Sequence, residues 1–222
     1  MVAFRGGVTR RPVTVGGAPY REVVTIQAPA VWRLPAVGEW ERLTRLPADL
    51  LQALLADPET VARYNAKVYQ RGAGQCWPWV GALGSAGHGR LRCGTRALEP
   101  ERPASRVIAS HVFGWQLSRG ILAADPVTGR LPLICHRCDE PSCHNPAHWV
   151  CGTAADNWAD YVARRHSPGS PLTDTRGPRG RAVAIRSVIL AALAEGAGAG
   201  EVEAAIEAAG AAGIPGAQGA LF

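Results

Sequence analysis

The sequence contains almost no lysine and no long apolar run. Lys67 is the only lysine among 24 basic residues, so all the other cations are arginines. No stretch reaches the roughly 18 uncharged apolar residues that a membrane-spanning helix needs. Residues 1–11 contain arginines but lack the apolar core of a secretory signal. We therefore expect a cytoplasmic protein with no membrane partner.

Acidic residues are outnumbered. Lys and Arg total 24 against 18 Asp and Glu, which gives a formal net charge of +6 in 222 residues. Hydrophobic residues make up 47% and charged residues 19%, a composition typical of a globular chain and unlike that of a disordered one. Arginine can bind phosphate through two parallel hydrogen bonds. The balance therefore favours a polyanion as the partner.

The even number of cysteines raises the question of disulfide bonds. A cytoplasmic chain keeps its thiols reduced, and cysteines in that setting more often bind metal or fill the core. We therefore expect free thiols, with Cys135 and Cys151 as small buried hydrophobes at strand ends. The six are Cys76, Cys93, Cys135, Cys138, Cys143 and Cys151.

The first half of the chain alternates between extended and helical patterns. A short strand is expected at 21–26. Apolar residues at helical spacing predict helix across 46–71, with a restart at Pro58. Extended structure with turns is predicted at 72–92, and a further helix at 105–119.

The second half begins with the order strand, loop, strand, helix. Strands are predicted at 131–135 and 149–152, and the loop between them is polar and contains prolines. Thr153 is expected to open a helix that runs to about Arg164. Asp156 stands at the position that completes a capping box.

The end of the chain changes composition twice. Residues 167–181 are rich in proline and glycine, which predicts a linker, and Ala/Leu-rich helices are predicted at 182–195 and 201–210. Three arginines of the linker are candidates for phosphate contacts outside the main domain: Arg176, Arg179 and Arg181.

Three potential metal ligands are evenly spaced in the loop between the two later strands. The pattern is Cys138-x4-Cys143-x4-His148, and thiolate and imidazole are ligands that zinc prefers. Cys76, far upstream in a Trp-rich segment, would complete a tetrahedral Cys3His site, with Cys93 as the alternative. Four protein ligands leave no open position, so such a site would hold the loop in one conformation.

A histidine and an asparagine flank this loop. His136 follows the first strand, and Asn157 lies one turn into the helix after the second strand. Two strands and a helix in this order direct an imidazole and an amide oxygen toward one point. The imidazole can take a proton from water, and the amide oxygen can hold a hard cation such as Mg²⁺.

Residues 136–160, HRCDEPSCHNPAHWVCGTAADNWAD, resemble phage HNH nucleases of the His-Me finger (ββα-metal) superfamily. The ligand spacing is similar to that of the zinc-bearing His-Cys box homing endonucleases. Shorter segments at 63–68, 76–79 and 110–115 are similar as well, as is the turn at 87–90. The resemblance therefore covers about residues 60–166.

The resemblance implies an α+β fold with helical N- and C-terminal extensions. Its His-Me finger core, with a structural zinc loop, would occupy 60–166, preceded by an extension at 1–59. The linker at 167–181 and an Ala-rich helical tail at 182–222 would follow. The implied activity is that of a metal-dependent endonuclease that hydrolyses phosphodiester bonds in double-stranded DNA, in the cytosol of a phage-infected or bacterial cell.

The resemblance also implies residue roles. His136 would be the general base, Asn157 would hold a catalytic Mg²⁺, and Asn145 would brace the loop and orient the base. A structural Zn²⁺ would be bound by Cys76, Cys138, Cys143 and His148. The candidates for a phosphate contact are Arg90, Arg92, Arg102 and Arg106.

Two positions depart from the family pattern. Val112 stands where an arginine often follows the residue matching His111, and Cys135 stands where an acidic metal ligand often precedes the catalytic histidine. The alternative hypothesis is a non-cleaving, zinc-stabilised DNA-binding or regulatory module, which needs the zinc ligands but neither His136 nor Asn157. The other histidines are expected to be structural or solvated: His88, His111, His144 and His166.

Overall fold

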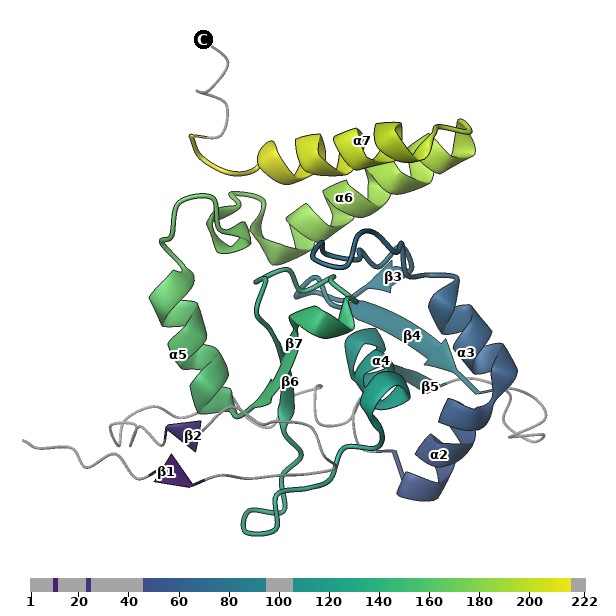
Figure 1. The fold of residues 1–222 in the computed structure, drawn as a ribbon, viewed down its shortest axis with the longest axis vertical. Helices are drawn as coiled ribbons and strands as arrows, with labels where there is room; N and C mark the ends of the chain where they lie inside the picture. Colours follow the sequence, from purple (N-terminus) through teal and green to yellow (C-terminus); the bar gives the residue numbers. More distant parts are fainter. Residues whose placement is uncertain (1–9, 12–22, 25–45, 95–105, 217–222) are drawn as a thin grey trace, which may run out of the picture.

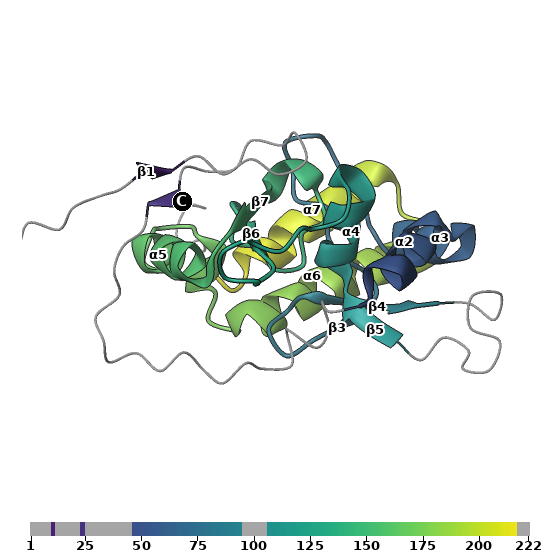
Figure 2. The same ribbon diagram turned by 90° about the horizontal axis from the view of Figure 1, so that it is seen from below.

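The computed structural model describes residues 46–94 and 106–216, together with two short strands (Figures 1 and 2). These strands, β1 (Arg10–Arg11) and β2 (Val23–Val24), pair antiparallel, and β2 lies within the strand expected at 21–26. Helices and small antiparallel sheets make up the described chain, so the fold class is α+β. Among these residues, every helix is too short or too polar to cross a membrane.

Two consecutive helices open the main part of the described chain, α2 (Ala48–Ala56) and α3 (Pro58–Asn65). Asp57 separates them, because its side chain accepts a hydrogen bond of 2.8 Å from the backbone N–H of Thr60 and so caps α3. Proline at the first position of α3 fits the same start signal, since the missing N–H is not needed there.

The helix predicted across 46–71 ends earlier than expected, at Asn65. Val68 instead forms an isolated antiparallel β-bridge with Trp79. Helix propensity is a weak preference that tertiary pairing can override, and a β-branched valine suits the extended conformation. The prediction was therefore wrong for the last turns before Arg71.

A three-stranded antiparallel sheet follows, in the order β3 (Ala82–Leu83), β4 (Gly89–Cys93), β5 (Arg106–Ala109). Burial alternates along β4, where Leu91 and Cys93 face the core. This alternation is what a sheet with one covered face requires. The extended structure predicted at 72–92 is confirmed for β3 and for β4.

The prediction of a helix at 105–119 is correct only for the second part of this segment. Its first part is β5, in which Ile108 pairs with Leu91 of β4, and helix α4 (Ser110–Arg119) begins only afterwards. Valine and isoleucine in β5 are strand-favouring residues whose apolar spacing also fits a helix over so short a run. Strand pairing with β4 decides between the two.

One hydrophobic core joins α2, α3, the β3–β5 sheet and α4. A second one packs α4 against the strands that carry the predicted site. The first core consists of Leu54, Tyr64, Trp79, Leu91, Cys93, Ile108 and Phe113. The second consists of Ala109, Val112, Trp115, Ile134, Trp149 and Cys151. Helix α4 belongs to both cores and so lies between the two sheets.

The predicted order strand, loop, strand, helix is confirmed. Strands β6 (Leu133–His136) and β7 (Trp149–Gly152) form an antiparallel pair in which His136 lies opposite Trp149. Helix α5 (Ala154–Arg164) follows at once, opened by a reciprocal capping box between Thr153 and Asp156. In Figure 1, α5 stands at the opposite side of the molecule from α2 and α3.

The C-terminal part is a helical hairpin that lies across one end of the molecule (Figure 1). After the short 3₁₀ helix η2 (Pro171–Thr173), α6 (Gly177–Ala194) and α7 (Ala199–Ala211) pack on each other. The hydrophobic cluster between them consists of Ile185, Ile189, Val202 and Ile206, and half-buried Tyr69 and Val80 of the main domain pack against it. The two Ala/Leu-rich helices are thus where the sequence predicted them, and they contact the core.

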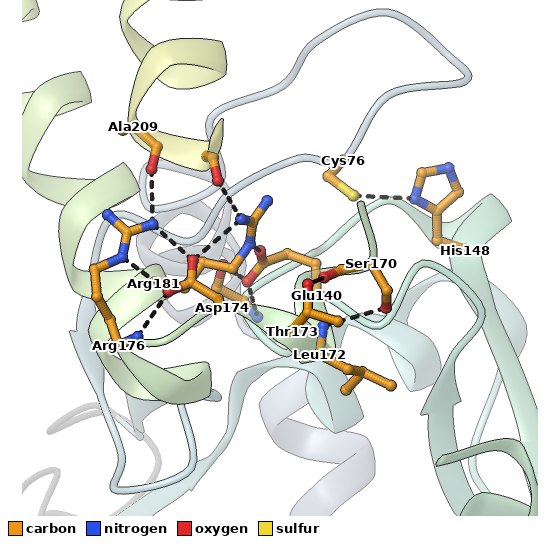
Figure 3. A network of polar contacts seen from close by, with 12 residues as sticks. Cys76, Glu140, His148, Ser170, Leu172, Thr173, Asp174, Arg176, Arg181 and Ala209 are labelled. Carbon is orange, nitrogen blue, oxygen red and sulfur yellow. Dashed lines mark hydrogen bonds and ion pairs between the residues drawn. The ribbon is translucent and has the colours of Figure 1, made fainter. Parts of the chain in front are cut away.

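The segment predicted as a linker, 167–181, is only partly one. Its last five residues belong to α6, and its Asp174 is buried beneath two arginines (Figure 3). Arg176 contacts the Asp174 carboxylate at 2.6 Å and Arg181 contacts it at 3.3 Å. Composition predicted a linker because ion pairs of this kind leave no periodic pattern in a sequence.

Replacement of Asp174 tests this ion-pair network. The Arg176 guanidinium holds the pKa of the Asp174 carboxyl below its usual range, so the charged form stabilises the fold above the unfolded pKa of about 3.9. Asp174→Asn should lower the free energy of unfolding by about 1–3 kcal/mol at pH 7. Urea denaturation should show the difference shrinking as the pH falls below about 4.

The matched control is Glu195→Gln, because Glu195 is exposed at the end of α6. Its unfolding curve should coincide with that of the wild type at both pH values. An Asp174→Asn protein as stable as the wild type at pH 7 would show that the network contributes nothing.

Candidate metal and catalytic centre

Four potential metal ligands lie together where the loop after β6 meets the segment before β3. The donor atoms of Cys76, Cys138, Cys143 and His148 all lie within 4.8 Å of one another. The sulfurs of Cys143 and Cys76 lie 3.5 and 3.6 Å from Nδ1 of His148 (Figure 3 shows the second pair). Typical Zn–S and Zn–N bonds at a tetrahedral angle separate sulfur from nitrogen by about 3.6 Å. The predicted ligands therefore form a Cys3His cluster that could bind a zinc ion.

A short antiparallel pairing brings Cys76 to the other three ligands. We call residues 137–148 the ligand loop. Pro78 forms a β-bridge with Cys143, the N–H of Trp79 donates to the Ser142 carbonyl at 2.9 Å, and the N–H of His144 donates to the Trp77 carbonyl at 2.7 Å. Backbone hydrogen bonds thus place Cys76 beside the loop independently of a metal.

The predicted choice of Cys76 over Cys93 is the one that the geometry supports. Cys93 is fully buried in the first core, and its thiol donates to the Arg106 carbonyl at 3.6 Å. Cys135 and Cys151 are buried in β6 and β7, as expected for small apolar side chains. None of the six cysteines, all of which lie within the described residues, forms a disulfide bond.

The cluster favours the charged form of one sulfur. Hydrogen bonds from the thiols of Cys143 and Cys76 lower the pKa of Cys138 well below the usual range of a thiol. Thiolate is the form of cysteine that binds a metal ion. The same hydrogen bonds raise the pKa of Cys76 and of Cys143, so a divalent cation would displace the protons of these two thiols on binding.

Asn145 braces the ligand loop. Its side-chain amide donates hydrogen bonds of 2.7 Å to the carbonyls of Ala73 and Gln75, just before Cys76. Its side-chain oxygen accepts from the N–H of Ala147 and so caps η1 (Pro146–His148). These hydrogen bonds fit the predicted bracing of the loop by Asn145. They do not fit its other predicted role, the orientation of His136, because the partners of the Asn145 side chain are Ala73, Gln75 and Ala147.

The ring of His136 contacts the backbone of a candidate metal ligand instead. Nε2 of His136 lies 3.1 Å from the Cys143 carbonyl oxygen, and Nε1 of Trp149 lies 3.1 Å from the same oxygen. The indole N–H of Trp149 also lies 3.3 Å from Nε2 of His136. Nε2 donates to the carbonyl in one tautomer and accepts from Trp149 in the other, and both contacts hold the same edge of the ring. Burial lowers the pKa of His136, which favours the neutral form.

Two further histidines, His88 and His111, lie beside His136. The sequence predicted a structural or solvated position for both and gave no sign that they contact His136. The ring centroids of His111 and His136 are 5.2 Å apart, those of His88 and His136 are 5.7 Å apart, and those of His88 and His111 are 4.8 Å apart. Burial lowers the pKa of His88 to about 3 and that of His111 well below its usual value. We call these three neutral rings the imidazole cluster.

The remaining two histidines behave as expected. His144 is buried, stacks on Trp79 with ring centroids 4.7 Å apart, and contacts the hydroxyl of Ser110 at 2.7 Å and the carbonyl of Ser142 at 2.9 Å. Its contacts tie the ligand loop to the start of α4. His166 is exposed.

Asn157 lies in the first turn of α5 with its side chain exposed. The loop of the capping box, Thr153 to Asp156, connects it directly to β7, which pairs with the strand of His136. Its amide oxygen is accessible to a cation or a substrate from solvent. Asp156, the carboxylate beside it, accepts hydrogen bonds from the N–H and the hydroxyl of Thr153.

The structure separates the four candidate arginines. Arg90 and Arg92 alternate with buried Leu91 on β4 and share the outer face of that strand. Arg106 pairs with Cys93, so the register puts it on the opposite face. Arg102 lies outside the described residues.

The arginines of the expected linker are engaged within the protein. Arg176 and Arg181 bind Asp174, and Arg181 also contacts the buried Glu140 carboxylate of the ligand loop at 2.7 Å. Arg179 donates to the Gly84 carbonyl at 3.3 Å. The charges of Arg176 and Arg181 thus help to attach the C-terminal hairpin, and a phosphate contact by these arginines stays a prediction.

Two phage proteins are similar to this chain. Protein 2.8 of Escherichia phage T7 is 28% identical over 100 residues, which cover 45% of this chain and 58% of the phage protein. Protein 7.7 of the same phage is 28% identical over 102 residues, which cover 44% of this chain and 64% of that protein. The matches thus span about three fifths of each relative. No family model matches the chain, and no solved structure matches it.

The ligand cluster generates a metal-content prediction. Purified protein should contain about one zinc ion per chain, and Cys143→Ser should lose it, because three ligands hold the ion far less tightly than four. The variant should also melt at a lower temperature. Elemental analysis and thermal denaturation measure the two effects.

Cys151→Ala is the matched control, since it removes a buried thiol outside the cluster. It should keep its zinc. Folded wild-type protein free of zinc would contradict the prediction, and loss of zinc from the control would place the ion elsewhere.

Proposed function

We propose that the chain is a metal-dependent endonuclease of the HNH type that hydrolyses phosphodiester bonds in double-stranded DNA. The single observation that carries the proposal is the position of His136. Its neutral imidazole is held by the Cys143 carbonyl and by Trp149 at the end of the first strand of a strand–strand–helix unit. The resemblance of residues 136–160 to the His-Me finger superfamily supports the same reading.

Zinc has a structural role in this proposal. Cys76, Cys138, Cys143 and His148 supply four ligands, which fill a tetrahedral shell and leave no position for substrate. The ion would hold Cys143 in place, and with it the carbonyl that lies 3.1 Å from Nε2 of His136. The metal would therefore support catalysis by fixing the backbone of the ligand loop.

His136 acts as the general base. The unprotonated ring nitrogen takes a proton from a water molecule, the water oxygen forms a bond to phosphorus, and the bond from phosphorus to the leaving oxygen breaks. The leaving oxygen takes a proton from solvent. Neutral imidazole is the form required, and burial of His136 favours it.

Asn157 holds Mg²⁺ in this proposal. Its exposed amide oxygen is a hard donor, and Mg²⁺ typically keeps several waters and completes its shell with substrate phosphate oxygens. When bound, the ion would neutralise charge on the scissile phosphate. Arg90 and Arg92, on the outer face of β4, are the residues of this chain best placed to contact the DNA backbone.

The net charge of +6 and the phage relatives are consistent with a nuclease carried by a phage. The competing hypothesis is a zinc-stabilised module that binds DNA without cleaving it. It explains the Cys3His cluster equally well, but it gives no reason for a neutral imidazole in the strand–strand–helix unit.

Replacement of His136 separates the two hypotheses. His136→Ala removes the base and no zinc ligand, so zinc content and DNA affinity should remain while nicking of supercoiled plasmid falls about 10²–10⁴-fold. The control is His166→Ala, an exposed histidine, which should nick at the wild-type rate. If wild type binds DNA but is inert with every divalent cation, the binding module replaces the enzyme.

Replacement of Asn157 tests the cation site. Asn157→Ala should raise the Mg²⁺ concentration needed for half-maximal nicking, because it removes a protein ligand. Asn157→Asp should retain activity, since it keeps an oxygen at the same reach. Equal Mg²⁺ dependence in wild type and Asn157→Ala would show that Asn157 does not hold the cation.

A further inference from the structure

The C-terminal hairpin of α6 and α7 contacts both segments that supply the candidate zinc ligands. One segment contains Cys76, and the other is the ligand loop, which contains the remaining three. Helix α6 contacts the ligand loop through Arg181, and α7 contacts the segment before Cys76 through Glu203. Because the two helices pack on each other around a buried apolar cluster, the hairpin connects the two segments.

The contact on the ligand loop is made to Glu140, which lies between two of the ligands and is only 3% exposed. Its backbone N–H donates to the sulfur of Cys138, and its carbonyl accepts from the N–H of Cys143 at 3.0 Å. Its carboxylate accepts from the N–H and the hydroxyl of Ser142 at 3.3 and 2.8 Å. Glu140 therefore fixes the turn that presents Cys138 and Cys143.

Arg181 supplies the countercharge for this buried carboxylate. Nε of Arg181 donates to Glu140 at 2.7 Å, and both side chains are nearly buried (Figure 3). The same guanidinium donates to the Gly210 carbonyl of α7 at 2.6 Å and to Asp174 at 3.3 Å. A buried charge that loses its partner is strongly destabilising. The position of Glu140 in the turn thus depends on the hairpin that holds Arg181 against it.

The contact on the other segment is made by Glu203 of α7. Its carboxylate accepts from Nε of Arg71 at 2.8 Å and from the side-chain amide of Gln75 at 3.1 Å. Gln75 directly precedes Cys76, and its carbonyl accepts from the side chain of Asn145 in the ligand loop at 2.7 Å. The residue before Cys76 is therefore held from two sides, by α7 and by the ligand loop.

We propose that the C-terminal hairpin is a clamp of the metal centre, in which Arg181 and Glu203 are positioning residues that hold the two ligand segments in place for zinc. The clamp requires the candidate zinc site but not the nuclease activity. Ligands that are in place before the metal binds lose less conformational freedom on binding. Residues that orient metal ligands typically change metal affinity about 10–100-fold when they are replaced.

The rate of zinc release from the folded protein tests the clamp. Zinc-loaded protein is mixed with an excess of a chromogenic zinc chelator well below its melting temperature. Arg181→Met and Glu203→Ala should each release zinc about 10–100-fold faster than the wild type. Two matched controls should release it at the wild-type rate. Arg179→Met changes an exposed arginine of α6, and Glu207→Ala changes an exposed glutamate of α7 whose contact with Arg71 is long, at 4.0 Å.

A double variant tests whether Arg181 acts through Glu140. Glutamine at position 140 still offers an oxygen to Ser142 but carries no charge that needs a cation. In a Glu140→Gln protein, the further change Arg181→Met should therefore lose most of its effect on zinc release, since residues that act through one another are not additive. This comparison also holds if the single variant Arg181→Met does not fold, because the double variant leaves no buried carboxylate in the turn.

Ile108→Val separates positioning of the ligands from overall stability. It removes one methylene from the first core, so it should lower the melting temperature without speeding zinc release. Wild-type release rates in both Arg181→Met and Glu203→Ala would overturn the clamp. An equal acceleration in Ile108→Val, or a full effect of Arg181→Met in the Glu140→Gln protein, would do the same. A wild type that holds zinc but does not nick DNA would contradict the proposed function and leave the clamp in place.

Discussion

The pairing between the segment around Cys76 and the ligand loop is the constraint on which the rest of the centre depends. Pro78 and Cys143 form the bridge, and two backbone hydrogen bonds flank it. Without it, three ligands of one loop would face solvent and the Cys143 carbonyl would have no fixed position. The same carbonyl accepts a hydrogen bond from Trp149 and lies 3.1 Å from Nε2 of His136. The candidate metal cluster and the imidazole thus share one residue, Cys143, whose sulfur belongs to the cluster and whose carbonyl contacts the ring.

The parts of the fold that the sequence predicted correctly have local causes. The capping box of Thr153 and Asp156 lies within four residues, and the strand pair β6–β7 is bounded by a polar loop with prolines. The errors fall where distant pairing decides. The sequence of β5 also fits a helix, and its pairing with β4 makes it a strand. Val68 lies outside the helix because it pairs with Trp79 in a β-bridge. Propensity over so few residues is too small to decide between such states.

The residues of the candidate site also fall into two groups, those that the sequence identified and those that only the structure brings together. Regular spacing identified Cys138, Cys143 and His148, and chemistry alone made Cys76 a candidate beside Cys93. The imidazole cluster left no such pattern, because His88 and His111 are far apart in the chain. Their one local signal is the glycine on each side of His88, which here marks a close approach of backbone to side chain. A histidine flanked by two glycines is weak evidence until the structure shows what it approaches.

Two of the contacts that attach the C-terminal hairpin lead to this centre. Arg181 of α6 contacts Glu140 of the ligand loop at 2.7 Å, and both side chains are nearly buried. The start of α6 also presses on the turn of His88, through the Pro178 carbonyl against Gly87. The first contact supports the loop that carries the Cys143 carbonyl, and the second supports the ring next to His111. The hairpin therefore packs against two segments that lie next to the His136 ring, the ligand loop and the turn of His88.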